Sequence, residues 1–283
     1  MAPPSQSHTQ SADPACAKEE DHKSKESNSI CNINSKDGSA VYSTPLHCYL
    51  NGSRPSPPPM AIQPSLLKER LNSAGDNQVF IIGIAGGSAS GKTSVSEAII
   101  RDINDVSNVV LISMDSFYKC LSPEASKKAY ANEYNFDHPD AFEFPLLYDT
   151  LLKLKNLEPV DIPVYDFKIH SRTSESVHIH KAKVVIFEGI LALYDREILD
   201  LMDMKIFVDT DSDVRLARRL KRDINERRRD FNGVLDQYNR FVKPSFDDFI
   251  QPSVRNADII IPRGKDNLVA IDLITKHILT KIK

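Results

Sequence analysis

Short runs of consecutive apolar residues recur along the sequence from residue 79 onward. They are rich in β-branched residues and continuous rather than alternating, which is typical of strands buried on both faces of a parallel sheet. Five such runs predict strands over residues 79–84, 109–113, 184–187, 205–208 and 258–261.

Helical patterns fall between these runs. They predict helices near residues 92–104, 145–155, 196–202, 212–226, 232–242 and 267–281. Strands that alternate with helices predict a three-layer α/β domain, in which a parallel five-stranded sheet lies between two layers of helices.

One insertion interrupts this alternation. Residues 158–183 contain two segments in which apolar and polar residues alternate, 160–165 and 176–180, and a polar turn joins them. This pattern predicts a β-hairpin that projects from the sheet.

Composition divides the chain unevenly near residue 77. Only two of the 21 aromatic residues, Tyr42 and Tyr49, precede that point, and this part is rich in proline and serine. Such a segment buries too little apolar surface to offset its ordering entropy. We therefore predict a disordered N-terminal tail over residues 1–76 and a single folded domain over residues 77–283.

The first predicted strand leads into a glycine-rich loop. Residues 86–93 read Gly-Gly-Ser-Ala-Ser-Gly-Lys-Thr, a G-x-x-x-x-G-K-[ST] motif between a strand and a helix. In that context backbone N–H groups and the helix N-terminus face phosphate oxygens, Lys92 reaches the β- and γ-phosphates, and Thr93 binds Mg²⁺. The motif predicts a nucleoside triphosphate site with the candidate ATP-binding residues Gly86, Gly87, Ser88, Ala89, Ser90, Gly91, Lys92, Thr93 and Ser94.

Acidic residues follow two of the other predicted strands. Asp115 comes shortly after the second strand, and Glu188 ends the third. Because ligands of open parallel sheets bind beyond the carboxyl ends of the strands, both carboxylates are site candidates. Glu188 suits Mg²⁺, whereas Asp115 suits either the metal or the role of general base for an attacking hydroxyl. Taken alone, each residue is equally typical of a helix N-cap or a turn.

Eight cations lie within 15 residues after the fourth strand: Arg215, Arg218, Arg219, Lys221, Arg222, Arg227, Arg228 and Arg229. In isolation such a run is typical of a solvated face or a nucleic-acid patch. The net charge of −3 and the lack of interleaved aromatic residues disfavour nucleic acid. We interpret the run as an arginine-rich lid that binds transferring phosphate.

A third group of candidates suits a nucleoside. Asp137 is a good acceptor for the vicinal hydroxyls of a sugar. Tyr165, Phe167 and His170 lie on one side of an extended segment or close to it, where they stack on a planar base. From spacing alone, core packing is favoured for Phe167 and a surface hydrogen bond for His170.

Together these motifs resemble the uridine–cytidine kinase family, and most of all its uridine kinase-like branch. The matching strings follow family order and include residues 86–93, Met114-Asp-Ser-Phe-Tyr-Lys119, Phe136-Asp-His-Pro-Asp-Ala-Phe142, Ile162-Pro-Val-Tyr-Asp-Phe167, Phe187-Glu-Gly-Ile190, Phe241-Val-Lys-Pro-Ser245 and Ile261-Pro-Arg-Gly264. The resemblance implies a nucleoside-monophosphate-kinase-like P-loop fold. It also implies transfer of the ATP γ-phosphate to the 5′-hydroxyl of uridine or cytidine, a step of pyrimidine salvage.

The resemblance implies a role for each matching residue. Asp115 is the expected base, and the expected Mg²⁺ ligands are Thr93, Asp115 and Glu188. The lid residues expected at the ATP phosphates are Arg222, Arg227 and Arg229. The expected nucleoside site comprises Tyr118, Phe136, Asp137, Tyr165, Phe167, His170, Arg219, Arg229 and Gln237. Family members are commonly homotetramers inhibited by UTP and CTP, and both properties are expectations here.

The sequence departs from the family pattern in two places. The lid reads Glu226-Arg-Arg-Arg-Asp230, with Arg228 where the family usually has glycine, and arginine alters the lid if that position requires a positive φ. Relatives in the kinase-like branch also have a C-terminal half that resembles uracil phosphoribosyltransferase. The sequence ends at Lys283, so we expect no such activity from it.

Other functions stay open at this point. A kinase for another small hydroxylated acceptor, such as phosphoribulose or pantothenate, uses the same scaffold, although the aromatic hairpin favours a nucleoside. A P-loop GTPase is disfavoured because no Asn-Lys-x-Asp motif occurs. A regulatory or scaffolding homologue with little turnover is the alternative from another class, and the intact Lys92, Thr93, Asp115 and Glu188 argue against it.

The sequence also bears on location. No apolar run approaches the roughly 20 residues of a spanning helix, and the N-terminus lacks an apolar signal core. We expect no membrane and no nucleic-acid partner. The expected location is cytoplasmic, with the arginine run as an alternative signal for the nucleus.

Overall fold

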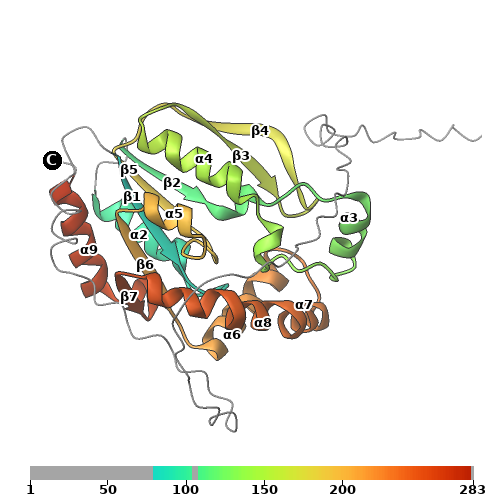
Figure 1. Cartoon of the computed structure of the whole chain (residues 1–283). Coiled ribbons are helices and arrows are strands. Elements are labelled where there is room, and N and C mark those ends of the chain that lie inside the picture. Colours follow the sequence, from blue (N-terminus) through green and yellow to red (C-terminus); the bar gives the residue numbers. More distant parts are fainter. Residues whose placement is uncertain (1–78, 104–107, 282–283) are drawn as a thin grey trace, which may run out of the picture. The chain divides into compact units, whose positions relative to one another are not determined.

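The computed structural model describes residues 79–103 and 108–281 (Figure 1). The predicted tail over residues 1–76 lies outside the described residues, and so do residues 77 and 78 of the predicted domain. The order of elements below therefore refers to the domain alone.

A parallel sheet of five strands forms the centre of the domain (Figure 1). The strands are β1 (Phe80–Ala85), β2 (Val109–Ser113), β5 (Val184–Glu188), β6 (Met204–Asp209) and β7 (Ile259–Pro262). Their order across the sheet is β2-β5-β1-β6-β7. β1 and β5 are buried along their whole length, as continuous apolar runs in the middle of a covered sheet should be. The five predicted strands are confirmed.

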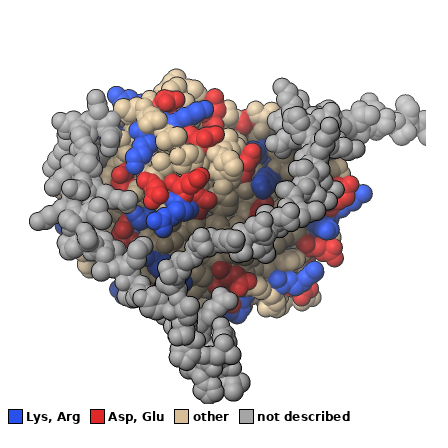
Figure 2. Space-filling view, in the orientation of Figure 1, with Lys and Arg blue, Asp and Glu red and all other residues tan. Residues whose placement is uncertain are grey.

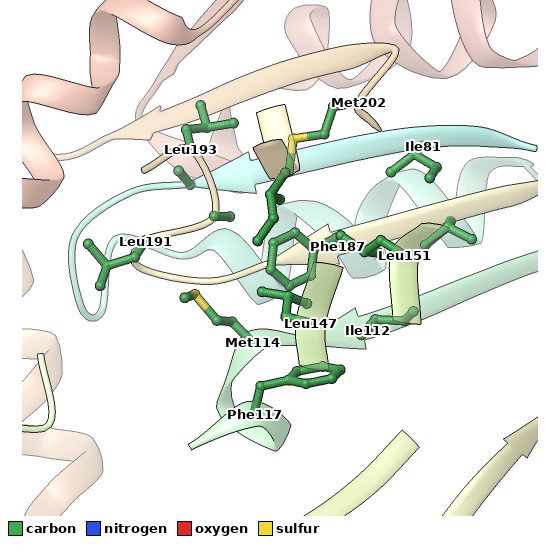
Figure 3. Packing of buried hydrophobic residues seen from close by; sticks show 14 of the residues in the cluster. Ile81, Ile112, Met114, Phe117, Leu147, Leu151, Phe187, Leu191, Leu193 and Met202 are labelled. Carbon is green, nitrogen blue, oxygen red and sulfur yellow. The ribbon is translucent and has the colours of Figure 1, made fainter. Parts of the chain in front are cut away.

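Helices cover both faces of the sheet. α2 (Lys92–Ile103) and α9 (Leu268–Lys281) pack together on one face. α4 (Phe144–Lys155) and α5 (Arg196–Leu201) cover the other face, where Figure 3 shows Phe187 of β5 close to Leu147 of α4. The three-layer prediction is confirmed.

The remaining helices differ most from the sequence prediction. α3 (Pro123–Tyr130) was not predicted, although Ser122 caps it by accepting from the Ala125 N–H and proline occupies its first turn. α6 (Ser212–Asn225) and α7 (Phe231–Gln237) were predicted. The helix predicted near residues 232–242 does not end near residue 242. A π-helical turn (Tyr238–Val242), α8 (Lys243–Ser245), a second π-helical turn (Phe246–Ile250) and a 3₁₀ helix (Gln251–Asn256) continue it.

The predicted hairpin is present as a separate two-stranded sheet. β3 (Val160–Asp166) and β4 (Ser171–Ile179) pair antiparallel. Phe167 and His170 lie in the turn between them rather than on a strand, and His170 has a φ of 50°. The turn geometry, and not strand alternation, therefore sets the direction of these two side chains.

Strand register brings three sequence motifs to one edge of the sheet. Glu188 of β5 lies opposite Ile84 of β1 on one side and Ser113 of β2 on the other. Asp115 follows in a 3₁₀ turn (Met114–Phe117). The 86–93 loop, Asp115 and Glu188 thus meet at the carboxyl ends of adjacent strands, where open α/β sheets bind ligands.

The surface and the helices show two further features. On the face seen in Figure 2, lysine and arginine side chains are interspersed with aspartate and glutamate. Among the residues that the structure describes, no helix combines the length and the apolar character needed to cross a bilayer.

Candidate active site

The glycine-rich loop between β1 and α2 is closely packed. Gly86 has a φ of 150°, and a Cβ atom there would lie 2.5 Å from the Val208 carbonyl oxygen, so a side chain does not fit. Lys92 is 8% exposed, and its Nζ donates to the Gly87 carbonyl at 3.1 Å. Because α2 begins at Lys92, the positive end of its dipole faces the same space.

A cavity of about 370 Å³ opens beside this loop. Of the residues predicted for the site, all except Gly86, Gly87 and Ser90 line it. Five further residues line it that were not among the predicted site residues: Ser113, Gly189, Ile190, Arg218 and Glu226. The first three flank the strand ends already singled out, so the strand-end rule could have found them. Arg218 belongs to the arginine run, and Glu226 is the first residue of the lid sequence, so both lie in segments that the sequence already marked.

Two carboxylates lie at the centre of the cavity wall. Burial and, to a smaller extent, the neighbouring Glu188 carboxylate raise the pKa of Asp115 to about 6. Burial lowers the pKa of Lys92, although both carboxylates oppose this. Two neighbouring carboxylates at a buried site favour a bound cation in addition to Lys92.

These groups fit a magnesium ion. The Thr93 hydroxyl donates to Glu188 Oε1 at 2.9 Å, which joins a hydroxyl and a carboxylate at the foot of the loop. Within residues 79–103 and 108–281, no three His, Cys, Asp or Glu side chains are arranged to hold a metal by themselves. Mg²⁺ takes few protein ligands and completes its coordination with water and phosphate, so a small ligand set suits it.

Aromatic side chains form part of the cavity lining. The Tyr118 ring stacks on Phe142 at 4.4 Å and lies 5.0 Å from the Tyr165 ring. The His170 ring lies nearly parallel to Phe136, with centroids 5.0 Å apart. Burial lowers the pKa of His170, and Arg229 lowers it further, so its imidazole is neutral at pH 7. The result is an apolar slot with neutral polar edges.

Asp137 lies between the aromatic slot and the arginines. It is 7% exposed, and its N–H donates to the Asn135 side chain at 3.0 Å. Burial raises its pKa, while Arg219 and Lys92 pull in the opposite direction. This buried acceptor has no hydrogen-bond donor assigned to its carboxylate among the described contacts.

The arginines of α6 and of the segment after it make different contacts. Arg219 donates to the Ser88 hydroxyl at 2.8 Å and to Gln237 Oε1 at 3.0 Å, and Arg229 donates to the same Gln237 oxygen at 2.9 Å. Arg215 lies one turn before Arg219 on the same face of α6, but it does not line the cavity. Its guanidinium stacks over Phe246 at 3.8 Å and donates to the Thr210 carbonyl at 3.0 Å.

The segment between α6 and α7, residues 226–230, closes one side of the cavity. The Arg227 guanidinium lies 4.6 Å from the Phe167 ring centroid, which joins this segment to the hairpin turn. Arg228 is exposed and has a φ of 54°, a left-handed conformation that costs a residue with a Cβ atom about 1 kcal/mol or more.

Arg228 offers a direct test of how much this strain matters. Glycine relieves it but gains entropy in the unfolded chain, so Arg228→Gly should change the free energy of unfolding by less than about 1 kcal/mol. We expect the rate of turnover at this site to stay within about threefold of wild type, because Arg227 and Arg229 remain. Chemical denaturation and steady-state kinetics measure the two quantities. A tenfold gain in kcat would instead mean that Arg228 misdirects its neighbours.

The fold and the cavity define a P-loop kinase scaffold. The chain belongs to the phosphoribulokinase/uridine kinase family, because the sequence model of that family matches residues 81–270. It is 56% identical over 206 residues to uridine-cytidine kinase-like 1 of Mus musculus, covering 73% of this chain and 37% of that protein. It is 50% identical over 214 residues to uridine-cytidine kinase B of Dictyostelium discoideum, covering 76% and 87%.

Two solved structures share the fold. Phosphoribulokinase from Rhodobacter spheroides has a TM-score of 0.52 at 17% identity, covering 65% of this chain and 70% of that one. D-glycerate 3-kinase from Cryptococcus neoformans has a TM-score of 0.51 at 19% identity, covering 67% and 86%. The chain spans less than half the length of several curated relatives that it matches.

Proposed function

We propose that the protein phosphorylates the 5′-hydroxyl of uridine and cytidine with ATP and Mg²⁺, giving UMP and CMP. One observation carries this proposal. A single cavity is lined by the phosphate-binding loop, by aromatic side chains and by Asp115, whose carboxylate interacts electrostatically with Lys92 of the loop and with Tyr118 and Tyr165. These three groups suit a phosphate donor and a planar acceptor with a hydroxyl group.

At the donor end, the loop and Lys92 bind the β- and γ-phosphates, and Arg222, Arg227 and Arg229 neutralise charge that develops during transfer. Thr93 and Glu188 hold Mg²⁺ with help from Asp115, and the ion supplies charge neutralisation when bound. Asp115 accepts the proton of the attacking hydroxyl. Its pKa near 6 leaves it ionised at neutral pH, as a base must be.

At the acceptor end, Asp137 accepts hydrogen bonds from the vicinal hydroxyls of ribose, and Arg219 and Gln237 flank it. The rings of Tyr118, Phe136 and Phe167 frame the nucleoside. Tyr165 and His170 read the edge of the pyrimidine, and the Tyr165 hydroxyl is buried without a hydrogen-bond partner among the described residues. A buried, unpaired hydroxyl in the slot supports a polar ligand there.

The test is turnover of the full chain with Mg-ATP against uridine, cytidine, thymidine, adenosine, pantothenate and ribulose 5-phosphate. We expect turnover with uridine and cytidine only, at least about 100-fold above the other acceptors in kcat/KM. Turnover confined to pantothenate or to the sugar phosphate would assign another acceptor to the same scaffold. ATP binding without any turnover would favour a regulatory or scaffolding role.

The remaining properties follow from the same proposal. Inhibition by UTP and CTP is expected, because each resembles a product and a phosphate donor joined together. We propose a homotetramer, no nucleic-acid or membrane partner, and a cytoplasmic location with the nucleus as the alternative. Light scattering tests the assembly, and steady-state kinetics at defined UTP and CTP concentrations test the inhibition.

A further inference from the structure

Asp223 lies in the last turn of α6, outside the cavity lining, and is 0% exposed. Four guanidinium groups surround its carboxylate. The nearest guanidinium nitrogens lie 3.6, 2.9, 3.5 and 4.0 Å from its oxygens, in the order Arg219, Arg222, Arg227 and Arg229. All four arginines line the cavity, whereas Asp223 does not.

The four arginines come from two elements that Asp223 joins. Arg219 and Arg222 belong to α6, while Arg227 and Arg229 belong to the segment that follows it. The Asp223 carbonyl also accepts from the Arg229 N–H at 3.0 Å. One residue therefore ties the segment to the helix through its backbone and through its side chain.

The balance of charge explains why such a residue is needed. Four guanidinium groups this close repel one another, because solvent screens partly buried charges less than exposed ones. Burial alone would raise the pKa of Asp223, but Arg222, Arg219 and Arg227 outweigh it and the pKa is lowered. The carboxylate is thus ionised at neutral pH and is the only acid that the described ion pairs give to these arginines.

The pairing is incomplete on one side. Arg219 Nε and Asp223 Oδ2 are both buried without a hydrogen-bond partner among the described residues, and they lie 3.6 Å apart. The carboxylate therefore attracts Arg219 without fully satisfying it. The other nitrogens of Arg219 are directed to Ser88 of the phosphate loop and to Gln237.

We propose that Asp223 is a positioning residue: a built-in counterion that holds the four arginines together and directed at the cavity before the phosphates of the donor arrive. The proposal rests on the function proposed above. Asp223 touches neither donor nor acceptor and acts only through the arginines. The nucleotide phosphates share these arginines with the carboxylate when they bind.

This role predicts two effects of opposite sense for Asp223→Asn. Removing the negative charge behind four guanidinium groups makes the cavity more attractive to anions, so binding of Mg-tripolyphosphate should tighten about three- to tenfold. The arginines are then no longer held in one arrangement, so kcat with ATP and uridine should fall at least about tenfold. General damage to the lid predicts weaker binding together with slower turnover.

The experiment compares wild type, Asp223→Asn and Asp223→Glu as full chains. Calorimetric titration gives the Kd for tripolyphosphate with Mg²⁺, and steady-state kinetics give kcat and KM. Asp213→Asn is the matched control, because it removes an exposed carboxylate from the first turn of the same helix. We expect it to match wild type. Asp223→Glu retains the charge, so it should bind tripolyphosphate like wild type and recover part of the lost kcat.

Tighter tripolyphosphate binding with lower kcat in Asp223→Asn supports the proposal. Unchanged kcat, or weaker binding with lower kcat, overturns it. If Asp223→Asn does not fold, Asp223→Glu decides alone: a kcat at least about threefold below wild type with unchanged tripolyphosphate affinity supports the role, and an unchanged kcat overturns it. Tripolyphosphate binding needs no acceptor. A wild type without nucleoside turnover would therefore refute the proposed function and still leave the binding effect to be measured.

Discussion

Asp115→Asn is expected to lower kcat for uridine phosphorylation by about a thousandfold. An effect of this size is typical when a general base is removed. Binding of a non-hydrolysable ATP analogue should persist, because the loop and Lys92 are intact. Steady-state kinetics and calorimetric titration measure the two effects. Asp272→Asn is the control, since Asp272 is exposed on α9 and does not line the cavity.

The same substitution should make the protein more stable at neutral pH. The pKa of Asp115 is raised from 3.8 to about 6 in the folded state, mainly by burial and further by Glu188. The folded protein therefore binds this proton more tightly than the unfolded chain does, and stability is lost as pH rises from about 4 through 6. That difference corresponds to at most about 3 kcal/mol, so the variant should gain several degrees in Tm at pH 7 and little at pH 4.

The pH dependence of the rate gives a third signature. Below its pKa Asp115 is protonated and cannot act as a base, so kcat/KM should fall as pH falls through about 6. A bound divalent cation shifts this limb to lower pH, because it favours the carboxylate. The limb should be absent in Asp115→Asn. An unchanged kcat in that variant would remove Asp115 from the mechanism.

The sheet was predictable because its signals are local and strong. Continuous apolar runs such as 184–187 have no good alternative to a buried strand. The rule that ligands bind beyond the carboxyl ends of parallel strands predicts from the sequence that Asp115 and Glu188 lie together. The β2–β5 register does bring the two strand ends side by side. α3 was not predicted, because its sequence has almost no apolar residues that could show a helical period. Its only sequence signal is the N-cap residue Ser122, followed by proline.

The rest of the site depends on conformations that no periodicity encodes. Pro244 favours a helix end near residue 242, yet a π-helical turn before it lets the chain continue. The direction of the His170 side chain is set by its positive φ in the hairpin turn. Asp223 sits within a run of arginines, and such a pattern is more often a solvated face with helical ion pairs than a buried centre. Its burial became visible only in three dimensions.

The second large effect is expected at Asp137. Asp137→Ala should lower kcat/KM for uridine by about a thousandfold, because a site built to accept two hydroxyl protons loses its acceptor. Asp137 is 7% exposed, and burial raises its pKa, so its removal should not destabilise the fold. Binding of an ATP analogue should be unchanged. Asp140→Ala is the matched control, because Asp140 lies three residues further on with an exposed side chain.

A second substrate turns this substitution into a test of the contact itself. 2′,3′-Dideoxyuridine lacks both hydroxyls, and wild type should use it about a thousandfold less efficiently than uridine. If Asp137 binds those hydroxyls, Asp137→Ala should lose most of that preference and use the two nucleosides within about tenfold of each other. A variant that keeps the full preference would show that other groups read the ribose. Arg219 and Gln237, which hydrogen-bond one another beside Asp137 in the same cavity, would then be the side chains to replace.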